Sequence, residues 1–192
     1  MNKVRLKLKG VSEIVGSSEV ALLVLTDEQE SRQLSVVCDK AMAYELSMRL
    51  GDAPVNPILL PEVLCRVVGD MDELHYEVLI NGLVEGQYRA VLLNKFTFDM
   101  IPIRVSDGVL LSLIARLPLF IEQNLMNRQS VAFKQGTNGV AIPVNTLSND
   151  MLKEALETAI GEENYELASH LRDEMRRRKW SKDNPDNADR QL

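Results

Sequence analysis

Cysteine and histidine are scarce in this chain, which has only 2 of each among its 192 residues. Cys38 and Cys65 both lie inside apolar segments, so we expect buried free thiols and a reducing compartment. His75 and His170 lie far apart in the sequence, and neither has a cysteine beside it. This spacing argues against a zinc site of the Cys/His type.

Long apolar runs and an excess of positive charge are also missing. No apolar segment is long enough to cross a bilayer, and residues 1–10 alternate apolar with basic side chains instead of forming a signal-peptide core. We therefore expect a cytoplasmic protein that makes no membrane contact. The formal net charge of −6 argues against a surface that binds nucleic acid over its whole extent, although it allows a local basic groove.

Aromatic residues make up only 5% of the chain, so the core must be aliphatic, and its periodicity predicts the elements. The predicted strands cover residues 1–10, 19–25, 33–38, 74–84 and 87–93, and the predicted helices cover residues 40–50, 59–68 and 106–116. Asp39 is the expected N-cap of the first helix, Gly51 follows its end, and Pro61 fits the first turn of the second. These elements predict an α+β fold with a mixed, mostly antiparallel sheet and helices packed on it.

The alternation of apolar residues changes part-way along residues 96–105. The apolar side chains fall first on one parity and then on the other, as Phe96, Phe98, Met100 and then Ile101, Ile103, Val105. Such a switch predicts a β-bulge near Met100 and Ile101, which would also accommodate Pro102.

The composition changes after residue 127, where Gln, Asn, Gly and Ser become frequent. We predict a main α+β domain, a linker, a helical hairpin and a disordered tail, at residues 1–127, 128–147, 148–180 and 181–192. The linker contains one predicted short strand at residues 139–144. In the hairpin, Gly161 is expected to end the first helix and Asn164 to cap the second.

The predicted hairpin has an apolar face on each helix, formed by Leu152, Leu156, Ala159, Ile160 and by Tyr165, Ala168, Leu171, Met175. Two short helices bury little surface alone, so we expect them to pack on a partner hairpin, on a second copy of the chain or on the main domain. Arg172 and Arg176 share one face of the second helix. Their charges either offset the partial negative charge at the C-terminal end of that helix and keep it solvated, or form a docking patch for an acidic partner or nucleic acid.

Residues 102–113 contain polar side chains that packing does not require. An apolar strand ends there and an apolar helix begins, with Arg104, Ser106 and Asp107 at the junction. Ser106 has the properties of an N-cap, and Asp107 would lie in the positively polarised first turn. Arg104 and Asp107 either form a structural ion pair or belong to a functional site, because open α/β sheets place ligands at strand-to-helix junctions.

Residues 3–126 resemble the bifunctional nuclease domain, a small α+β domain found in bacteria and plants. The most specific motif is Ile-Arg-Val-Ser-Asp at residues 103–107, which is similar to the arginine-x-serine-aspartate signature before the family's leucine-rich helix. The strand at residues 32–37 and the hairpin around residues 86–88 also fit the family. The resemblance implies a nuclease that acts on DNA and RNA.

The same resemblance implies a catalytic site formed by Arg104, Ser106 and Asp107, with Mg²⁺ or Mn²⁺ as cofactor. Phosphodiester hydrolysis needs an activated water and stabilisation of the charge on the phosphoryl oxygens. Arg104 would hold the phosphate, Asp107 would bind the metal or orient the water, and Ser106 would donate to a phosphate or cap the helix.

The chain departs from the family at two other places. Where the family has a glutamate between its second strand and first helix, this chain has no matching carboxylate, although Asp39 and Glu45 lie nearby. The histidine and aspartate that enter the family's second helix are replaced, and only Glu62 remains acidic there. These losses favour a second hypothesis, in which the chain keeps the fold as a non-catalytic scaffold.

Residues 152–179 resemble the UVR motif, the short helical pair of the B and C subunits of bacterial excision repair. The matching runs are Leu-Lys-Glu-Ala-Leu-Glu, Glu-Asn-Tyr-Glu-Leu-Ala and Leu-Arg-Asp-Glu. The resemblance implies protein–protein contact, with Tyr165, Leu171, Arg172 and Arg176 as partner-binding residues. We expect the hairpin to recruit a protein partner or a second protomer, and the protein to be a homo-oligomer.

Overall fold

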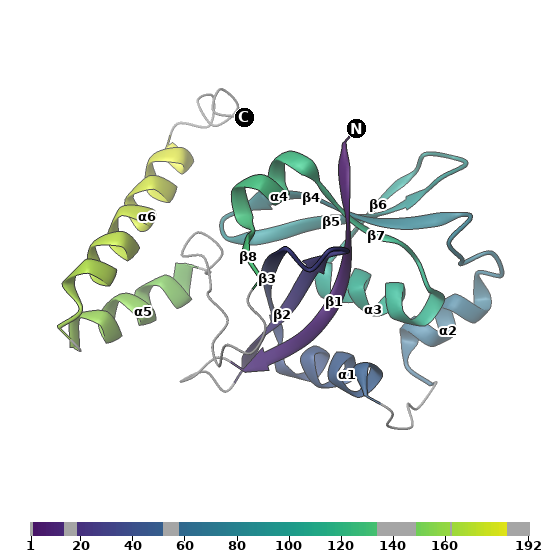
Figure 1. The fold of residues 1–192 in the computed structure, drawn as a ribbon, viewed down its shortest axis with the longest axis horizontal. Coiled ribbons are helices and arrows are strands. Elements are labelled where there is room, and N and C mark those ends of the chain that lie inside the picture. The colour runs from purple at the N-terminus through teal and green to yellow at the C-terminus, as the bar shows by residue number, and fades with distance from the viewer. Residues whose placement is uncertain (1, 14–18, 52–57, 134–148, 162, 184–192) are drawn as a thin grey trace. The chain divides into compact units, whose positions relative to one another are not determined.

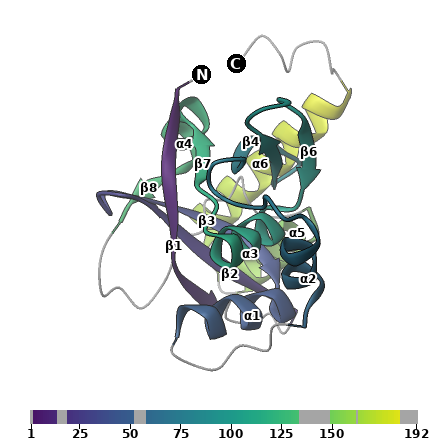
Figure 2. The same cartoon turned by 90° about the vertical axis from the view of Figure 1, so that its right-hand side faces the viewer.

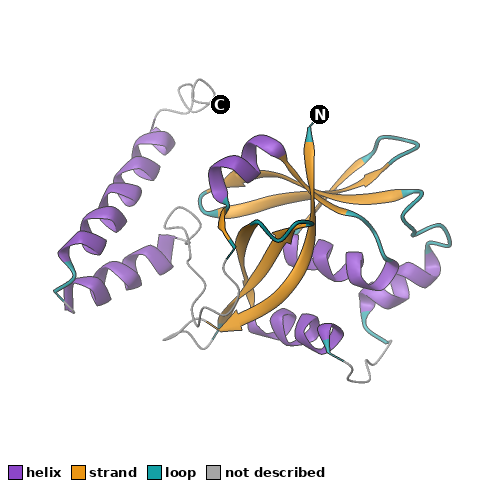
Figure 3. Cartoon of the chain, viewed as in Figure 1, coloured by secondary structure: helices purple, strands orange, loops and turns teal. Residues whose placement is uncertain are grey.

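The computed structural model describes residues 2–13, 19–51, 58–133, 149–161 and 163–183. It divides into two compact units, and we call the described residues up to 133 the sheet unit and the C-terminal helices the hairpin. Within the described residues, the sheet unit contains an eight-stranded sheet with helices packed against it (Figures 1 and 3). The predicted α+β fold is confirmed.

The strands are β1 Lys3–Glu13, β2 Val20–Asp27, β3 Arg32–Asp39, β4 Tyr76–Val84, β5 Gln87–Asn94, β6 Met100–Ile103, β7 Leu119–Glu122 and β8 Val131–Ala132. Their order across the sheet is β6-β5-β4-β7-β1-β2-β3-β8. β4 and β7 are parallel, whereas β1 is antiparallel to both β2 and β7, β3 to both β2 and β8, and β5 to β6. The sheet is therefore mixed and mostly antiparallel, as the sequence predicts.

The first strand has the alternation that its sequence predicts. Leu6 is buried in the core, Val4 and Leu8 pack against it, and the basic side chains between them are exposed. Lys3 reaches the buried carboxylate of Glu77 on β4, with Nζ 2.6 Å from Oε2. This strand is thus tied to β4 although β7 lies between them.

The predicted bulge near Met100 and Ile101 is wrong. The register between β5 and β6 runs without a shift from Leu93 opposite Met100 to Ala90 opposite Ile103. The apparent change of parity arises because residues 95–97 form a turn, and Phe98, with φ 61°, takes a left-handed backbone before the strand begins. The structure places a register shift in β1 instead, between Leu8 and Gly10.

Four helices belong to the sheet unit in its described part: α1 Lys40–Leu50, α2 Leu60–Val67, α3 Val105–Ala115 and α4 Gln123–Gln129. Asp39 caps α1 as predicted, because its Oδ1 accepts a hydrogen bond from the Met42 amide at 2.8 Å. Pro61 lies in the first turn of α2, also as predicted. Two views show α1, α2 and α3 close together beside the sheet (Figures 1 and 2).

Close packing between α3 and β4 depends on Gly108. A Cβ at this position would lie 2.8 Å from Val78 Cγ1, and Val78 is fully buried. We expect Gly108→Ala to lower the free energy of unfolding by about 1–3 kcal/mol, because the helix must move away from the strand. Urea denaturation followed by circular dichroism measures this change. Gly82→Ala is the matched control, since its Cβ would lie 3.7 Å from Arg89 Cβ, an ordinary contact, and a destabilisation as large as that of Gly108→Ala would contradict the argument.

The hairpin consists of α5 Asn149–Gly161 and α6 Tyr165–Asp183. Its core contains the predicted residues Leu152, Ala159, Ala168 and Leu171, with Leu156 and Met175 packed against them. Two residues predicted for the inner faces are instead exposed, Ile160 at 55% and Tyr165 at 70%, because they lie beside the tight turn between the helices.

The Asn164 carbonyl accepts a hydrogen bond from the Ala168 amide at 3.0 Å, which places Asn164 at the start of α6 as predicted. The helix continues to Asp183, so residues 181–183 are helical although we predicted a tail from residue 181. The strand predicted at residues 139–144 lies outside the described residues. No described helix is long and apolar enough to cross a membrane.

Candidate functional site

The strand-to-helix junction begins where β6 ends at Ile103. Arg104 takes an extended backbone, with φ −65° and ψ 144°, and occupies the N-cap position of α3. Its carbonyl accepts the first helical hydrogen bond, from the Gly108 amide at 2.9 Å. Asp107 lies in the first turn, as predicted. The helix begins one residue earlier than expected, so the prediction that Ser106 caps it is wrong, and Ser106 is buried inside the first turn.

The Arg104 guanidinium forms a bidentate pair with the Asp107 carboxylate. Arg104 Nε lies 2.6 Å from Asp107 Oδ2, and Nη2 lies 3.0 Å from Oδ1. The Asp107 hydrogen bond and charge raise the pKa of Arg104 above its ordinary value, so the guanidinium stays charged. The Arg104 side chain is still 67% exposed, which leaves it within reach of a solute.

Asp39 is a second carboxylate at this junction, which the motif at residues 103–107 does not include. Its Oδ2 lies 3.5 Å from Arg104 Nη1, while its Oδ1 caps α1. The N-terminal ends of α1 and α3 therefore share one arginine. Helix N-termini and a guanidinium all favour a bound anion, whereas the two carboxylates oppose one. The sequence already placed Asp39 at the start of a helix, but gave no signal for its contact with Arg104.

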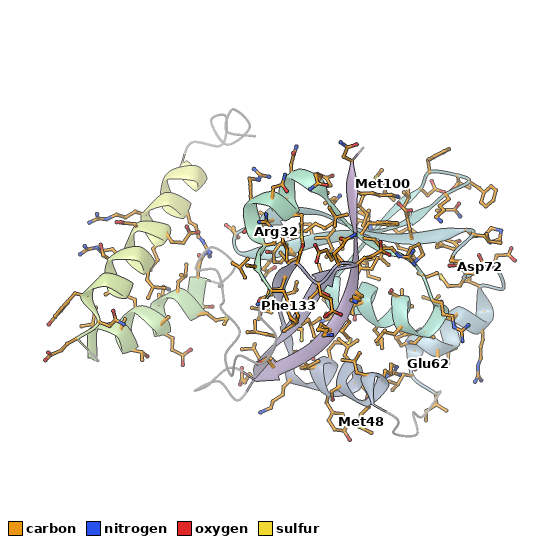
Figure 4. The ribbon with its side chains drawn as sticks, viewed as in Figure 1. Arg32, Met48, Glu62, Asp72, Met100 and Phe133 are labelled. Atoms are coloured by element: carbon orange, nitrogen blue, oxygen red, sulfur yellow. The ribbon has the colours of Figure 1, made fainter. Side chains whose placement is uncertain are left out.

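Glu45 and Glu62, the other two carboxylates noted from the sequence, are both held by Arg49. Arg49 Nη1 lies 2.8 Å from Glu45 Oε2, and Nη2 donates to Glu62 Oε1. Figure 4 labels Glu62 on α2. Burial alone would lower the pKa of Arg49, but the hydrogen bonds and charges of the two glutamates raise it above its ordinary value. The Glu62 contact stabilises the docking of α2 on α1, and no sequence signal marks it because it is tertiary, whereas the Glu45 contact is a local i,i+4 pair within α1.

The sequence model of the bifunctional nuclease domain matches residues 23–134. This match covers more than half of the chain and includes Asp39, Arg104 and Asp107. The chain belongs to the bifunctional nuclease domain family. No curated protein matches the chain. Family membership supports a nuclease-family fold for the sheet unit, and the hairpin lies beyond the matched residues.

The metal that the bifunctional nuclease resemblance implies would have few ligands at this junction. Within the described residues, no three or more His, Cys, Asp or Glu side chains gather as a metal site. Asp39 and Asp107 are two carboxylates that flank one arginine. Mg²⁺ is often held by one or two carboxylates together with substrate phosphates, so these residues fit a metal that arrives with its substrate and do not fit a preformed site.

The two cysteines of this bifunctional nuclease domain are free thiols, as predicted. Cys38 is buried, and burial raises its pKa to about 12. Cys65 is half-buried, and burial raises its pKa as well. Both groups are protonated at neutral pH, so neither is a nucleophile.

The candidate partner-binding residues of the hairpin occupy different environments. Leu171 is 1% exposed and belongs to the core between α5 and α6. Tyr165, Arg172 and Arg176 are exposed. Leu171 therefore supports the internal packing of the hairpin, and the other three residues are available for contact with a partner.

Proposed function

We propose that the chain cleaves phosphodiester bonds of DNA and RNA at the junction between β6 and α3. One observation carries the proposal: an exposed guanidinium, aligned by a bidentate carboxylate, lies at a helix N-terminus inside a bifunctional nuclease domain. Arg104 would bind a non-bridging phosphate oxygen with Nη1, whose one polar partner in the described part of the chain is Asp39 Oδ2, at 3.5 Å. Ser106 is buried, so it is not proposed to touch the substrate.

Each carboxylate has a distinct role in this proposal. Asp107 aligns Arg104 and accepts a proton from the water that attacks phosphorus. The P–O bond to one nucleoside oxygen breaks in the same reaction, and that oxygen leaves and takes a proton from solvent. Asp39 holds the Arg104 guanidinium until a substrate phosphate replaces Asp39 as the partner of Nη1. A divalent cation held by these carboxylates and the substrate would supply Lewis-acid stabilisation of the phosphoryl oxygens.

The test is cleavage of end-labelled single-stranded DNA and RNA by the full chain with Mg²⁺, with Mn²⁺ and with EDTA. We expect cleavage of both polymers with a divalent cation and none with EDTA. The absence of cleavage in every condition, from protein with a cooperative unfolding transition, would overturn the proposal. It would support the second candidate function.

That second candidate is a non-catalytic scaffold that keeps the family fold. Two observations favour it. Asp107 already binds Nε and Nη2 of Arg104, and Arg49 pairs with both Glu45 and Glu62, so these two carboxylates are engaged in structural contacts. A scaffold of this kind would bind its partner through the hairpin and not through the junction. The cleavage assay separates the two candidates.

We also propose that the hairpin is a UVR-type interaction module through which the protein self-associates. Ile160 and Tyr165 expose apolar surface at its turn, and Arg172 and Arg176 supply charge on α6. Sedimentation velocity of the full chain should show an oligomer, and the double variant Ile160→Ser, Tyr165→Ser should sediment as a monomer. A wild-type protein that stays monomeric at all concentrations would contradict self-association.

The two free thiols support a cytoplasmic setting for this protein.

A further inference from the structure

A pocket of about 410 Å³ lies in the sheet unit between β1 and the C-terminal end of α3. It is lined by residues of β1, by the last turns of α3, by the segment that leads into β7 and by Glu28 of the turn after β2. Arg116, at its rim, and Arg104 lie at opposite ends of α3, roughly 18 Å apart along the helix axis. The pocket is therefore separate from the junction described above.

The charges around this pocket are mainly positive, although the chain as a whole is acidic. Arg5, Lys7 and Arg116 line it, and among its described lining residues Glu28 is the one carboxylate. Lys7 is paired with Glu30 outside the lining, with Nζ 2.7 Å from Oε1, so Arg5 and Arg116 are the cations available to a ligand. The Arg5–Glu28 contact is long, with Nε 3.7 Å from Oε1. Both side chains remain more than half exposed. A bound anion could therefore replace Glu28 as the partner of Arg5, with little loss of free energy from the broken ion pair.

Arg116 is the least satisfied of these cations. It is exposed, and within the described part of the chain it makes no ion pair or side-chain hydrogen bond. It caps α3 in a left-handed conformation, with φ 56°, where its charge offsets the partial negative charge of the helix end. An unpaired guanidinium at the rim of a pocket is suited to bind phosphate.

The inner wall of the pocket is apolar and held in a fixed position. Leu8 and Leu113 are partly exposed there, and Val109 and Leu117 are buried in the core behind them. The Ser112 hydroxyl donates to the Leu117 carbonyl at 2.6 Å, and the Val78 amide donates to the Pro118 carbonyl at 2.9 Å. These bonds anchor the segment from α3 to β7. A ligand with one anionic end and one uncharged body that carries apolar surface would match both parts of the pocket.

We propose that this pocket binds a mononucleotide, with its phosphate between Arg5 and Arg116 and its nucleoside against the apolar wall. The volume lies within the range of pockets that enclose ligands of this size. The proposal concerns binding alone and does not depend on cleavage at Arg104. A chain that fails to cut nucleic acid could still bind the nucleotide.

Isothermal titration calorimetry of the full chain with AMP tests the proposal, and inorganic phosphate and adenosine serve as the two half-ligands. We expect AMP to bind at least about tenfold more tightly than either half, because the phosphate and the nucleoside bind at adjacent places. Arg116→Asn should weaken AMP binding about tenfold, since asparagine tolerates the left-handed backbone but carries no charge. Glu28→Gln should tighten binding severalfold, because it releases Arg5.

Arg89→Gln is the matched control, because Arg89 is an exposed cation on β5 outside the pocket. Its AMP affinity should equal that of the wild type. The proposal is overturned if AMP shows no binding at millimolar concentration, or if the Arg116 and Arg89 variants lose affinity equally. Equal affinities for AMP and inorganic phosphate would also overturn it, because the apolar wall would then contribute nothing.

Discussion

Arg104→Gln is expected to slow cleavage of single-stranded DNA by about 100-fold or more, which is the usual effect of removing one positioned donor from a phosphoryl transition state. Glutamine keeps polar atoms near the Asp107 carboxylate but removes the charge. Arg104→Lys should recover little of the rate, because an ammonium cannot bind Asp107 through two donors and hold a phosphate with a third. Initial rates with end-labelled substrate measure both variants.

The control for this prediction is Arg89→Gln, which removes an exposed positive charge from β5. It should cleave at the wild-type rate. The melting temperature of Arg104→Gln should fall by only a few degrees, since the pair with Asp107 is largely exposed at the arginine end and contributes at most about 1 kcal/mol. If the rate falls no further than the folded fraction does, the pair is a structural ion pair and the site lies elsewhere.

Arg49→Met is expected to lower the free energy of unfolding by about 3–5 kcal/mol, because it leaves the Glu62 carboxylate buried without its cation. The Arg49 side chain is 7% exposed and that of Glu62 is 9% exposed. Glu62 Oε2 is buried and has no hydrogen-bond partner in the described structure, so Arg49 is the main group that compensates its charge. Urea denaturation monitored by circular dichroism measures the change.

The double variant Arg49→Met, Glu62→Met completes this test. An apolar pair of similar volume removes both charges, so we expect it to recover most of the lost stability. Glu45→Gln is a useful comparison, because Glu45 is 35% exposed and its loss should cost less than 1 kcal/mol. A single Arg49 variant within 1 kcal/mol of the wild type would show that α1 and α2 do not depend on this network.

Local sequence signals predicted much of the sheet unit. Asp39 caps α1, Pro61 starts α2 and the β4–β5 turn falls at Glu85 and Gly86, because each depends on the chemistry of one or two neighbouring residues. The Arg104–Asp107 contact was also predictable, since the two residues lie three positions apart.

Other features needed information that a single segment does not carry. Ser106 was expected to cap α3, but the backbone turns into the helix at Val105, one residue before the expected helix, so that Arg104 occupies the cap position. The apolar residues Phe96 and Phe98 suggested a strand, although both are exposed, Phe96 in the turn and Phe98 directly after it. The Arg49–Glu62 pair and the pocket beside Arg116 form only when separate elements dock. Local periodicity contains no signal for such contacts.

Cleavage by Asp107→Asn, measured beside the wild type on the same labelled DNA and RNA with Mg²⁺, tests most directly whether the β6–α3 junction is the site. The substitution keeps the shape of the side chain. It removes the negative charge that aligns Arg104, and it replaces one of the carboxylate oxygens that are proposed to take the proton. We predict that the wild type cuts both polymers and that the variant is slower by about 100-fold or more on each, while its melting temperature falls by only a few degrees, as for Arg104→Gln. A wild type that cuts neither polymer, or a variant that cuts at the wild-type rate, would contradict the account.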